Sequence, residues 1–171
     1  MAKKRYKVDI LSISSVEQLK KDLIAYQMEL ENKTRTLCQR LAEIGVQIAQ
    51  ANVVSLDAVF TGELFNSITS EEVLASKNRS VFLVKATSEH AIYVEVGTGI
   101  IGAESPYPGE LPVVYAQGKT IRQLSDGRYG WFYQRDGHWY FTEGMPSRPF
   151  MYLAGMELRE KIVSVAKEIF V

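Results

Sequence analysis

The sequence predicts an α+β fold, in which a long N-terminal helix and a C-terminal helix pack on an antiparallel β-sheet and an aromatic hairpin protrudes. Apolar residues recur every three or four positions from Val16 to Ile48 and again from Phe150 to Ile169, a spacing typical of amphipathic helices. Between them, several short runs alternate with the period of two that half-buried strands show. The 171 residues, of which 46% are hydrophobic, suffice for one core. We therefore expect a single domain over residues 1–171, with a flexible basic tail at 1–5 and an exposed loop at 100–118.

The charge and cysteine content restrict the class of protein. Twenty Lys and Arg residues balance twenty Asp and Glu residues, so no overall field attracts nucleic acid or an anionic membrane. The single Cys38 cannot form an intrachain disulfide, and the N-terminus lacks the apolar core of a signal peptide. No run approaches the roughly 18 apolar residues of a membrane span. We expect a soluble protein that folds in the cytoplasm.

The N-terminal part predicts a short strand followed by a long helix. Residues Tyr6 to Ile13 alternate and predict an edge strand. Ser14 and Glu17 form a capping-box pattern, which predicts the start of the helix. Its apolar stripe is Val16, Leu19, Leu23, Tyr26, Leu30, Leu37, Leu41, Ile44 and Ile48. Polar residues interrupt the stripe at Lys33-Thr34, where the helix could bend. A coiled coil is an open alternative, because a lone helix packed across a sheet has the same stripe.

The centre of the chain predicts a β-hairpin. The stretch TGELFNSI at 61–68 predicts a turn and a short element, and SVFLVKA at 80–86 is rich in strand-forming residues. HAIYVEVGTG at 90–99 alternates until Gly97-Thr98-Gly99, where glycine permits a sharp change of direction. We expect these last two runs to pair, with their turn at Thr87-Ser88-Glu89.

A second hairpin is predicted where aromatic residues are concentrated. Seven of the 18 aromatic residues lie between Tyr129 and Phe141, on either side of an Asp136-Gly137 turn signal. A two-residue turn would pair Trp131 with Thr142 and Tyr133 with Tyr140 on one face, and Phe132 with Phe141 and Gln134 with Trp139 on the other. Both faces are aromatic, so the second must meet another layer of the chain or another molecule. We assign Phe132 and Phe141 to the core and the other face to a partner, with Trp131, Tyr133, Arg135, His138 and Tyr140 as interface residues. Alternatively, the loop from Ile100 to Gln117 covers the outer face.

The C-terminal stretch predicts the last helix. GMPSRPF at 144–150 would introduce it, with Ser147 or Arg148 as the cap and Pro149 in the first turn. Its apolar stripe is Phe150, Leu153, Ala154, Leu158, Ile162, Val165, Ala166 and Ile169.

The sequence predicts no catalytic, cofactor or metal site. His90 and His138 are the only histidines, and zincin, redox CxxC, GxSxG, Walker and GxGxxG motifs are absent. Glu71 and Glu72 are adjacent carboxylates, which usually belong to a solvated face. Glu95 has two open interpretations, a charge-assisted pair with Arg148 or an ordinary exposed carboxylate.

Three stretches carry short motifs, which are TGELFNSI at 61–68, HAIYVEVGTG at 90–99 and GMPSRPFMYLAGMEL at 144–158. The motif residues are Thr61, Gly62, Leu64, Ser67 and Ile68, then Ala91, Tyr93, Val94, Glu95, Gly97 and Thr98, then Gly144, Arg148, Pro149 and Phe150. In this order they resemble the tail-completion and head-tail joining (neck) proteins of long-tailed phages, the gene-product-ten-like minor-capsid family of lambda-like siphophages. The resemblance covers roughly residues 15 to 170. The chain departs from the family pattern at Ala58-Val59-Phe60, which replace a proline, and at His90, which replaces an aromatic residue.

The resemblance implies a structural, non-enzymatic protein of a phage or prophage virion, located in the host cytoplasm during assembly and then in the neck. Its implied partners are itself, as a ring that could be a hexamer, a head-closure or connector protein, and a tail-tube or tail-terminator protein. DNA would only pass through the ring, and no cofactor, small-molecule substrate or membrane is implied. The alternative is a phage-encoded small hydrolase or ligand-binding domain with a pocket near His90, Tyr93 and Glu95.

Overall fold

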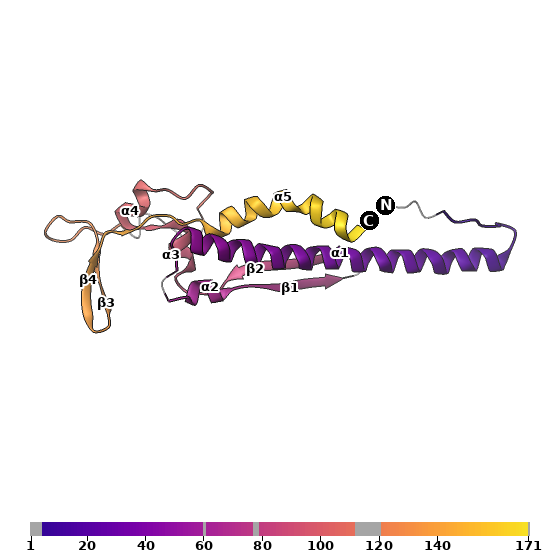
Figure 1. Ribbon diagram of the computed structural model, residues 1–171, viewed down its shortest axis with the longest axis horizontal. Helices are drawn as coiled ribbons and strands as arrows, with labels where there is room; N and C mark the ends of the chain where they lie inside the picture. Colours follow the sequence, from indigo (N-terminus) through magenta and orange to yellow (C-terminus); the bar gives the residue numbers. More distant parts are fainter. Residues whose placement is uncertain (1–4, 60, 77–78, 112–120, 171) are drawn as a thin grey trace.

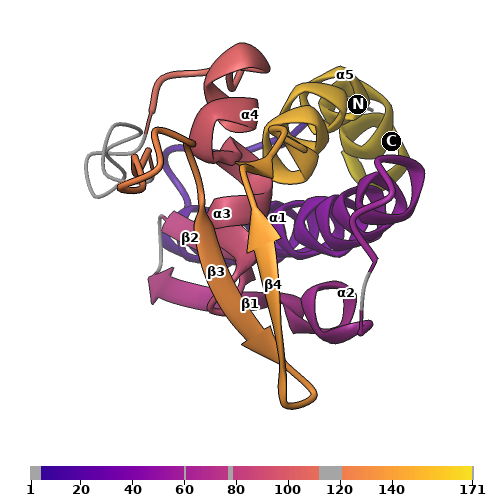
Figure 2. The ribbon, with the colours of Figure 1, turned by 90° about the vertical axis from the view of Figure 1, so that its left-hand side faces the viewer.

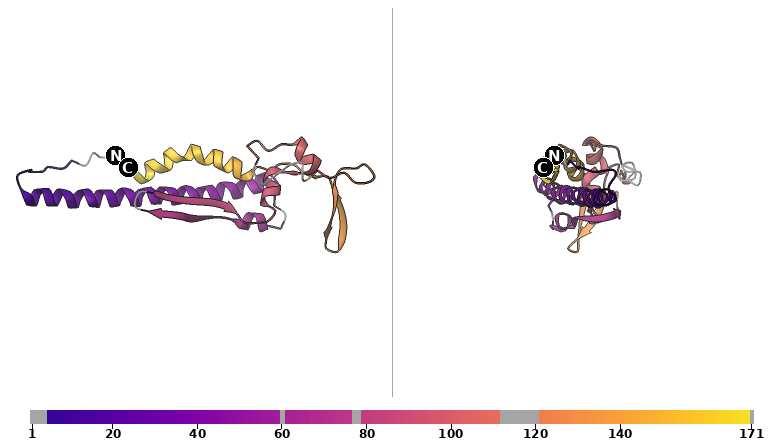
Figure 3. Two further views of the ribbon diagram at one scale, coloured as in Figure 1. Left: turned by 180° about the vertical axis from the view of Figure 1, so that it is seen from behind. Right: turned by 90° about the vertical axis from the view of Figure 1, so that its right-hand side faces the viewer.

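The computed structural model describes residues 5–59, 61–76, 79–111 and 121–170. The molecule is elongated along helix α1 (Ile13–Ser55), which lies between helix α5 (Phe150–Phe170) on one side and the hairpin of β1 (Ile68–Ser76) and β2 (Arg79–Ala86) on the other (Figure 1). The end-on view in Figure 3 shows the same three layers. The predicted α+β class, with long N-terminal and C-terminal helices and small antiparallel sheets, is confirmed. The β1–β2 hairpin and α5 both pack on α1, so α1 is the central layer.

Helix α1 begins earlier than predicted. Ser12 is its N-cap, and its hydroxyl accepts a hydrogen bond from the Ser15 N–H at 3.4 Å, whereas Ser14 was the expected cap. The helix continues without interruption through Lys33-Thr34. The predicted edge strand at Tyr6 to Ile13 is wrong, because residues 5–9 form no regular structure and are followed by a turn into α1. A strand needs a neighbouring strand to satisfy its backbone groups, and no described strand pairs with this segment.

The first hairpin pairs differently from the prediction. Strand β2 pairs with β1, which precedes it, and Ile68 lies opposite Ala86. The predicted strand at 90–99 is instead the short helix α3 (Ala91–Val96). In a six-residue helix, positions i and i+4 share a face, and here Ala91 and Glu95 are both buried. Helix α2 (Glu63–Ser67) is the short element expected before Ile68.

The second hairpin has the predicted register. β3 (Trp131–Arg135) and β4 (His138–Thr142) pair Trp131 with Thr142, Phe132 with Phe141 and Tyr133 with Tyr140. Asp136 and Gly137 have φ angles of 51° and 77°, as a two-residue turn with two left-handed residues requires. The hairpin projects from one end of the molecule, across the long axis (Figure 2).

The connection before this hairpin is partly helical. Helix α4 (Gly99–Glu104) occupies the start of the predicted loop, whereas residues 112–120, which include the end of the segment expected to cover the hairpin, lie outside the described residues. A two-residue strand β5 (Gly144–Met145) then leads back towards α5, and bridges join Thr98 to Met145 and Gly99 to Gly144. None of the helices in the described ranges has both the length and the apolar character to cross a membrane.

Candidate functional site

The three motif stretches meet at the C-terminal end of α1. Leu64 and Ile68 come from the first stretch, Ala91 from the second and Phe150 from the third, and all are 9% exposed or less. They form one core cluster with the α1 and α5 residues Ile48, Ala49, Val53 and Ala154. The motifs therefore supply the residues that hold four separate elements together.

Glu95 lies at the centre of this junction and caps α5. Its side-chain oxygens accept hydrogen bonds from the backbone N–H groups of Met151 and Tyr152, each at 2.9 Å. These N–H groups lie in the first turn of α5, where no intrahelical acceptor exists. A carboxylate there also interacts favourably with the helix dipole. The cap of α5 thus comes from α3 and not from Ser147 or Arg148, so the predicted local cap is wrong.

Ser147 and Arg148, which precede α5, bind the C-terminal end of α3. The Ser147 hydroxyl donates to the Glu95 carbonyl at 2.7 Å, and the Arg148 N–H donates to the Val94 carbonyl at 2.9 Å. These carbonyls lie in the last turn of α3, which would otherwise lack acceptor partners. The two helix ends therefore cap each other. No ion pair joins Glu95 to Arg148 among the described residues, so that predicted pair is also wrong.

The Glu95 carboxyl has a third polar neighbour in Tyr107, on the segment after α4. The Tyr107 hydroxyl hydrogen bonds to Glu95, and its ring lies edge-on to Tyr152 with centroids 5.6 Å apart. Burial raises the pKa of the Glu95 carboxyl above its ordinary value, although its hydrogen bonds favour the charged form. Burial and the Glu95 charge also raise the pKa of Tyr107. Sequence reasoning missed Tyr107, because no local pattern relates it to Glu95.

Two chain segments cross at the base of the second hairpin, where glycine is required. A Cβ on Gly99 would collide with the Glu143 carbonyl, and one on Gly144 with the Thr98 carbonyl. Both glycines also have left-handed φ angles, 63° and 108°. Gly97 has φ 82° and ends α3. The motif glycines therefore allow two backbone segments to approach closely. At Gly97 and Gly99 they also allow the change of chain direction that the sequence predicts.

The remaining motif residues have local roles. The Thr61 hydroxyl accepts a hydrogen bond from the Glu63 N–H at 3.3 Å, and Gly62 precedes α2 with φ 78°. Thr98 is 4% exposed. Tyr93 lies on α3 with 43% of its surface exposed. Pro149 is the residue before α5, and its carbonyl accepts from the Leu153 N–H at 3.0 Å.

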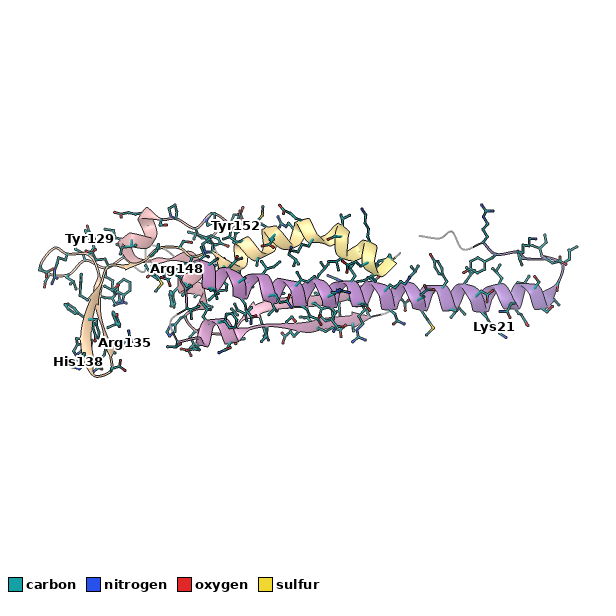
Figure 4. The ribbon with its side chains drawn as sticks, in the orientation of Figure 1. Lys21, Tyr129, Arg135, His138, Arg148 and Tyr152 are labelled. Carbon is teal, nitrogen blue, oxygen red and sulfur yellow. The ribbon has the colours of Figure 1, made fainter. Side chains whose placement is uncertain are left out.

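The predicted interface residues lie together on the β3–β4 hairpin. Tyr133 and Tyr140 stack with centroids 5.7 Å apart and remain 42% and 45% exposed. Arg135 and His138 lie at the exposed tip, far from the junction residues Arg148 and Tyr152 (Figure 4). Tyr133 and Tyr140 on this face are therefore accessible to a partner.

Aromatic residues on the opposite face of the hairpin are exposed as well. Phe132 is 50% and Trp139 is 67% exposed, and neither Phe132 nor Phe141 belongs to the core cluster. Their assignment to the core is therefore wrong. Phe132 and Phe141 pack on each other at 5.3 Å, and the Arg128 guanidinium lies 4.7 Å from the Phe141 ring centre. Two strands alone cannot cover either face of the hairpin, which needs another layer of structure.

The ionisable residues form no catalytic or metal-binding cluster in the described ranges. No three His, Cys, Asp or Glu side chains gather there as a metal site would require. Glu71 and Glu72 point to opposite faces of β1, where Glu71 pairs with Lys85 at 2.6 Å and Glu72 pairs with Arg35 of α1. His90 and His138 are exposed and lie on different elements.

Comparisons of the chain with protein-family models, with curated proteins and with solved structures find no match.

Proposed function

We propose that this chain is a structural protein of a phage or prophage virion neck, which assembles as a ring and joins head to tail. The observation that carries the proposal is the β3–β4 hairpin, whose aromatic side chains are exposed on both faces at one end of the molecule. Exposed Tyr and Trp bring large contact area at a small entropic cost and are common at the centres of interfaces. A hairpin of this kind is expected to be covered in an assembly.

The structural roles of the motif residues also support the proposal. Leu64, Ala91 and Phe150 lie in one core, and Glu95 caps the helix that Phe150 begins. Residues with these roles preserve a fold and need no substrate. The proposed partners are further copies of the chain, a head-closure or connector protein, and a tail-tube or tail-terminator protein. Because positive and negative residues balance, we expect DNA to pass the ring without being held by net charge.

The hydrolase or ligand-binding alternative has less support. It needs the Glu95 carboxylate to be free in a pocket with His90 and Tyr93. Instead, two backbone N–H groups of α5 and the Tyr107 hydroxyl already occupy the Glu95 side chain. A substrate would have to displace the cap of α5.

The test is the double variant Tyr133→Ala/Tyr140→Ala. We expect its thermal unfolding, followed by far-UV circular dichroism, to match wild type, because both rings are exposed. Head-tail joining, measured by complementation of a phage that lacks this gene, should fall strongly. Unfolding of the variant, or joining at the normal rate, would contradict the assignment of this face to assembly.

Tyr93→Ala is the matched control. Tyr93 has almost the same exposure as Tyr133, 43% against 42%, but lies on α3. We expect normal joining from this variant. Loss of joining with Tyr93→Ala alone would place the joining surface on α3 and not on the hairpin.

A further inference from the structure

The N-terminal part of α1 extends beyond the elements that pack on the rest of the helix. We call residues 13–30 the stalk, a length of about 27 Å at the usual rise per residue. In Figures 1 and 3, α5 and the β1–β2 hairpin both run beside the other half of α1 and leave the stalk projecting. Ion pairs join α1 to these elements at Arg35 with Glu72 and at Arg40 with Glu168, and the end of the stalk at Leu30 lines a hollow with Ser76 and Arg79 of the hairpin.

The apolar stripe of α1 continues along the stalk. Val16, Leu19, Leu23, Tyr26 and Leu30 are spaced alternately by three and four residues, which keeps them on one side of the helix. In the body, Leu37, Leu41, Ile44 and Ile48 continue this stripe and are half-buried or buried. The stalk therefore presents the kind of face that α1 covers elsewhere with a second helix.

This stripe is only partly covered in the single chain. Among the stripe residues, Val16 is 45% and Leu23 is 48% exposed. The N-terminal segment turns back along the stalk (Figure 1), yet Tyr6 and Val8 keep 38% and 39% of their surface in solvent. Those residues do not complete a core with the stalk.

We propose that the stalk pairs in parallel with the stalk of a second copy of this chain. The alternating three-four spacing is that of the a and d positions of a coiled coil, in which identical helices interlock. The inference rests on the proposed ring only for its biological setting. In a cyclic ring all copies point the same way, so neighbouring stalks are parallel by symmetry.

The charges beside the stripe favour the parallel arrangement. With Val16 at an a position, Asp22 and Glu29 lie on one flank of the stripe, and Lys20 and Gln27 lie on the other. An antiparallel pair would place the acidic flank of one stalk against the acidic flank of its partner, which is unfavourable. A parallel pair places each acidic flank beside the opposite flank, with Asp22 next to Gln27 of the second copy.

The stalk stripe is short, so we expect weak pairing that depends on concentration. It covers little more than two heptads, and helices of this length are marginal by themselves in water. Weak pairing keeps free copies separate and becomes effective when several copies are held together.

Sedimentation velocity over a range of concentrations tests the pairing. The variant Leu19→Gln/Leu23→Gln removes two stripe residues, and Lys21→Gln is the matched control. Lys21 lies on the far side of the helix from the stripe, away from α5 (Figure 4). Leu, Lys and Gln have similar helix propensities, so both variants should keep the helix. We expect the double variant to weaken self-association by about tenfold or more and the control to behave as wild type.

Disulfide crosslinking tests the orientation. Val16→Cys in a Cys38→Ser background places one thiol near the stalk tip. A parallel pair brings the two position-16 thiols together, so mild oxidation should give a covalent dimer. An antiparallel pair keeps them apart. Absence of the dimer under conditions where the wild-type chain self-associates would overturn the parallel arrangement.

Two other outcomes would overturn the pairing itself. One is a wild-type chain that stays monomeric at every concentration, and the other is equal association by wild type and Leu19→Gln/Leu23→Gln. Loss of head-tail joining by the stalk variant without any change in self-association would assign the stripe to a different protein. Failure of the neck function is measured separately, with Tyr133→Ala/Tyr140→Ala, so the two proposals can fail independently.

Discussion

The two β-hairpins of this chain are built alike but have opposite surroundings. β1–β2 lies along α1, where Val84 of β2 approaches Gly45 closely, and its first residue, Ile68, is 2% exposed. β3–β4 has far more aromatic surface, yet Phe132 and Trp139 are at least half exposed. Hydrophobicity along a strand therefore does not determine its burial. One face of the hairpin that follows α1 and α2 packs on α1, whereas aromatic side chains on both faces of the other hairpin are exposed.

The largest expected effect separates the two hairpins by stability. Ile68→Ala should lower the free energy of unfolding by about 2–5 kcal/mol, because it leaves a cavity in the core cluster. Urea unfolding followed by far-UV circular dichroism measures this loss. Tyr133→Ala/Tyr140→Ala, which removes more atoms from the exposed hairpin, serves as the comparison. Equal losses for the two variants would show that β3–β4 is as much part of the core as β1–β2.

The next effect concerns the junction that joins the exposed hairpin to the body. Glu95→Gln replaces one acceptor oxygen by an NH₂ group, so the N–H of Met151 or Tyr152 loses its partner. We expect a loss of about 1–3 kcal/mol at pH 7. Both tryptophans lie in β3–β4, so their fluorescence monitors that hairpin, and circular dichroism monitors the helices. A variant as stable as wild type would remove Glu95 from the cap.

The pH dependence of the same variant tests the state of the carboxyl. Because burial raises the pKa of Glu95, the folded protein binds this proton more tightly than the unfolded chain does. Its contribution to stability is therefore fully present below the ordinary pKa of Glu and decreases as the pH rises through the raised value. The difference in unfolding free energy between wild type and Glu95→Gln should therefore be larger near the ordinary pKa of Glu than at neutral pH. A difference that grows with pH would mean that the hydrogen bonds outweigh burial.

The smallest global effect is expected at the turn of the exposed hairpin. Gly137→Ala places a Cβ at φ 77°, at a cost of about 1–2 kcal/mol in the turn. Amide hydrogen exchange in β3–β4 should accelerate, whereas the thermal midpoint of the helices should not move. Gly127→Ala, at φ 86° in a neighbouring turn, is the control. A shifted midpoint for Gly137→Ala alone would show that the hairpin unfolds together with the body.

The accuracy of the sequence predictions follows how local each signal is. The register of β3–β4 was predictable, because Asp136-Gly137 fixes a two-residue turn and the turn fixes every pair. Strand β1 gave no comparable signal. Its sequence is largely polar, and an irregularity between Glu72 and Leu74 shifts the pairing and breaks the alternation. The stretch Ala91 to Val96 was misread because six residues are too few to separate the two periods.

The junction shows a different limit. The motifs identified Glu95, Gly97 and Phe150 as important residues, and all three are structurally required. Their partners could not be derived, because the cap of α5 is 56 residues away in the sequence and Tyr107 lies on another segment. A pattern within one helix cannot report an acceptor that arrives from elsewhere in the fold.

The central position of α1 has a consequence for how the chain folds during synthesis. Its sheet partner follows it directly, so α1 and β1–β2 can dock while the ribosome is still adding later residues. Its helical partner α5 is the last described element, so one apolar side of α1 stays bare until that helix emerges. The nascent chain therefore exposes this apolar surface until synthesis is nearly complete. Truncated products that end before Phe150 should aggregate or be bound by chaperones.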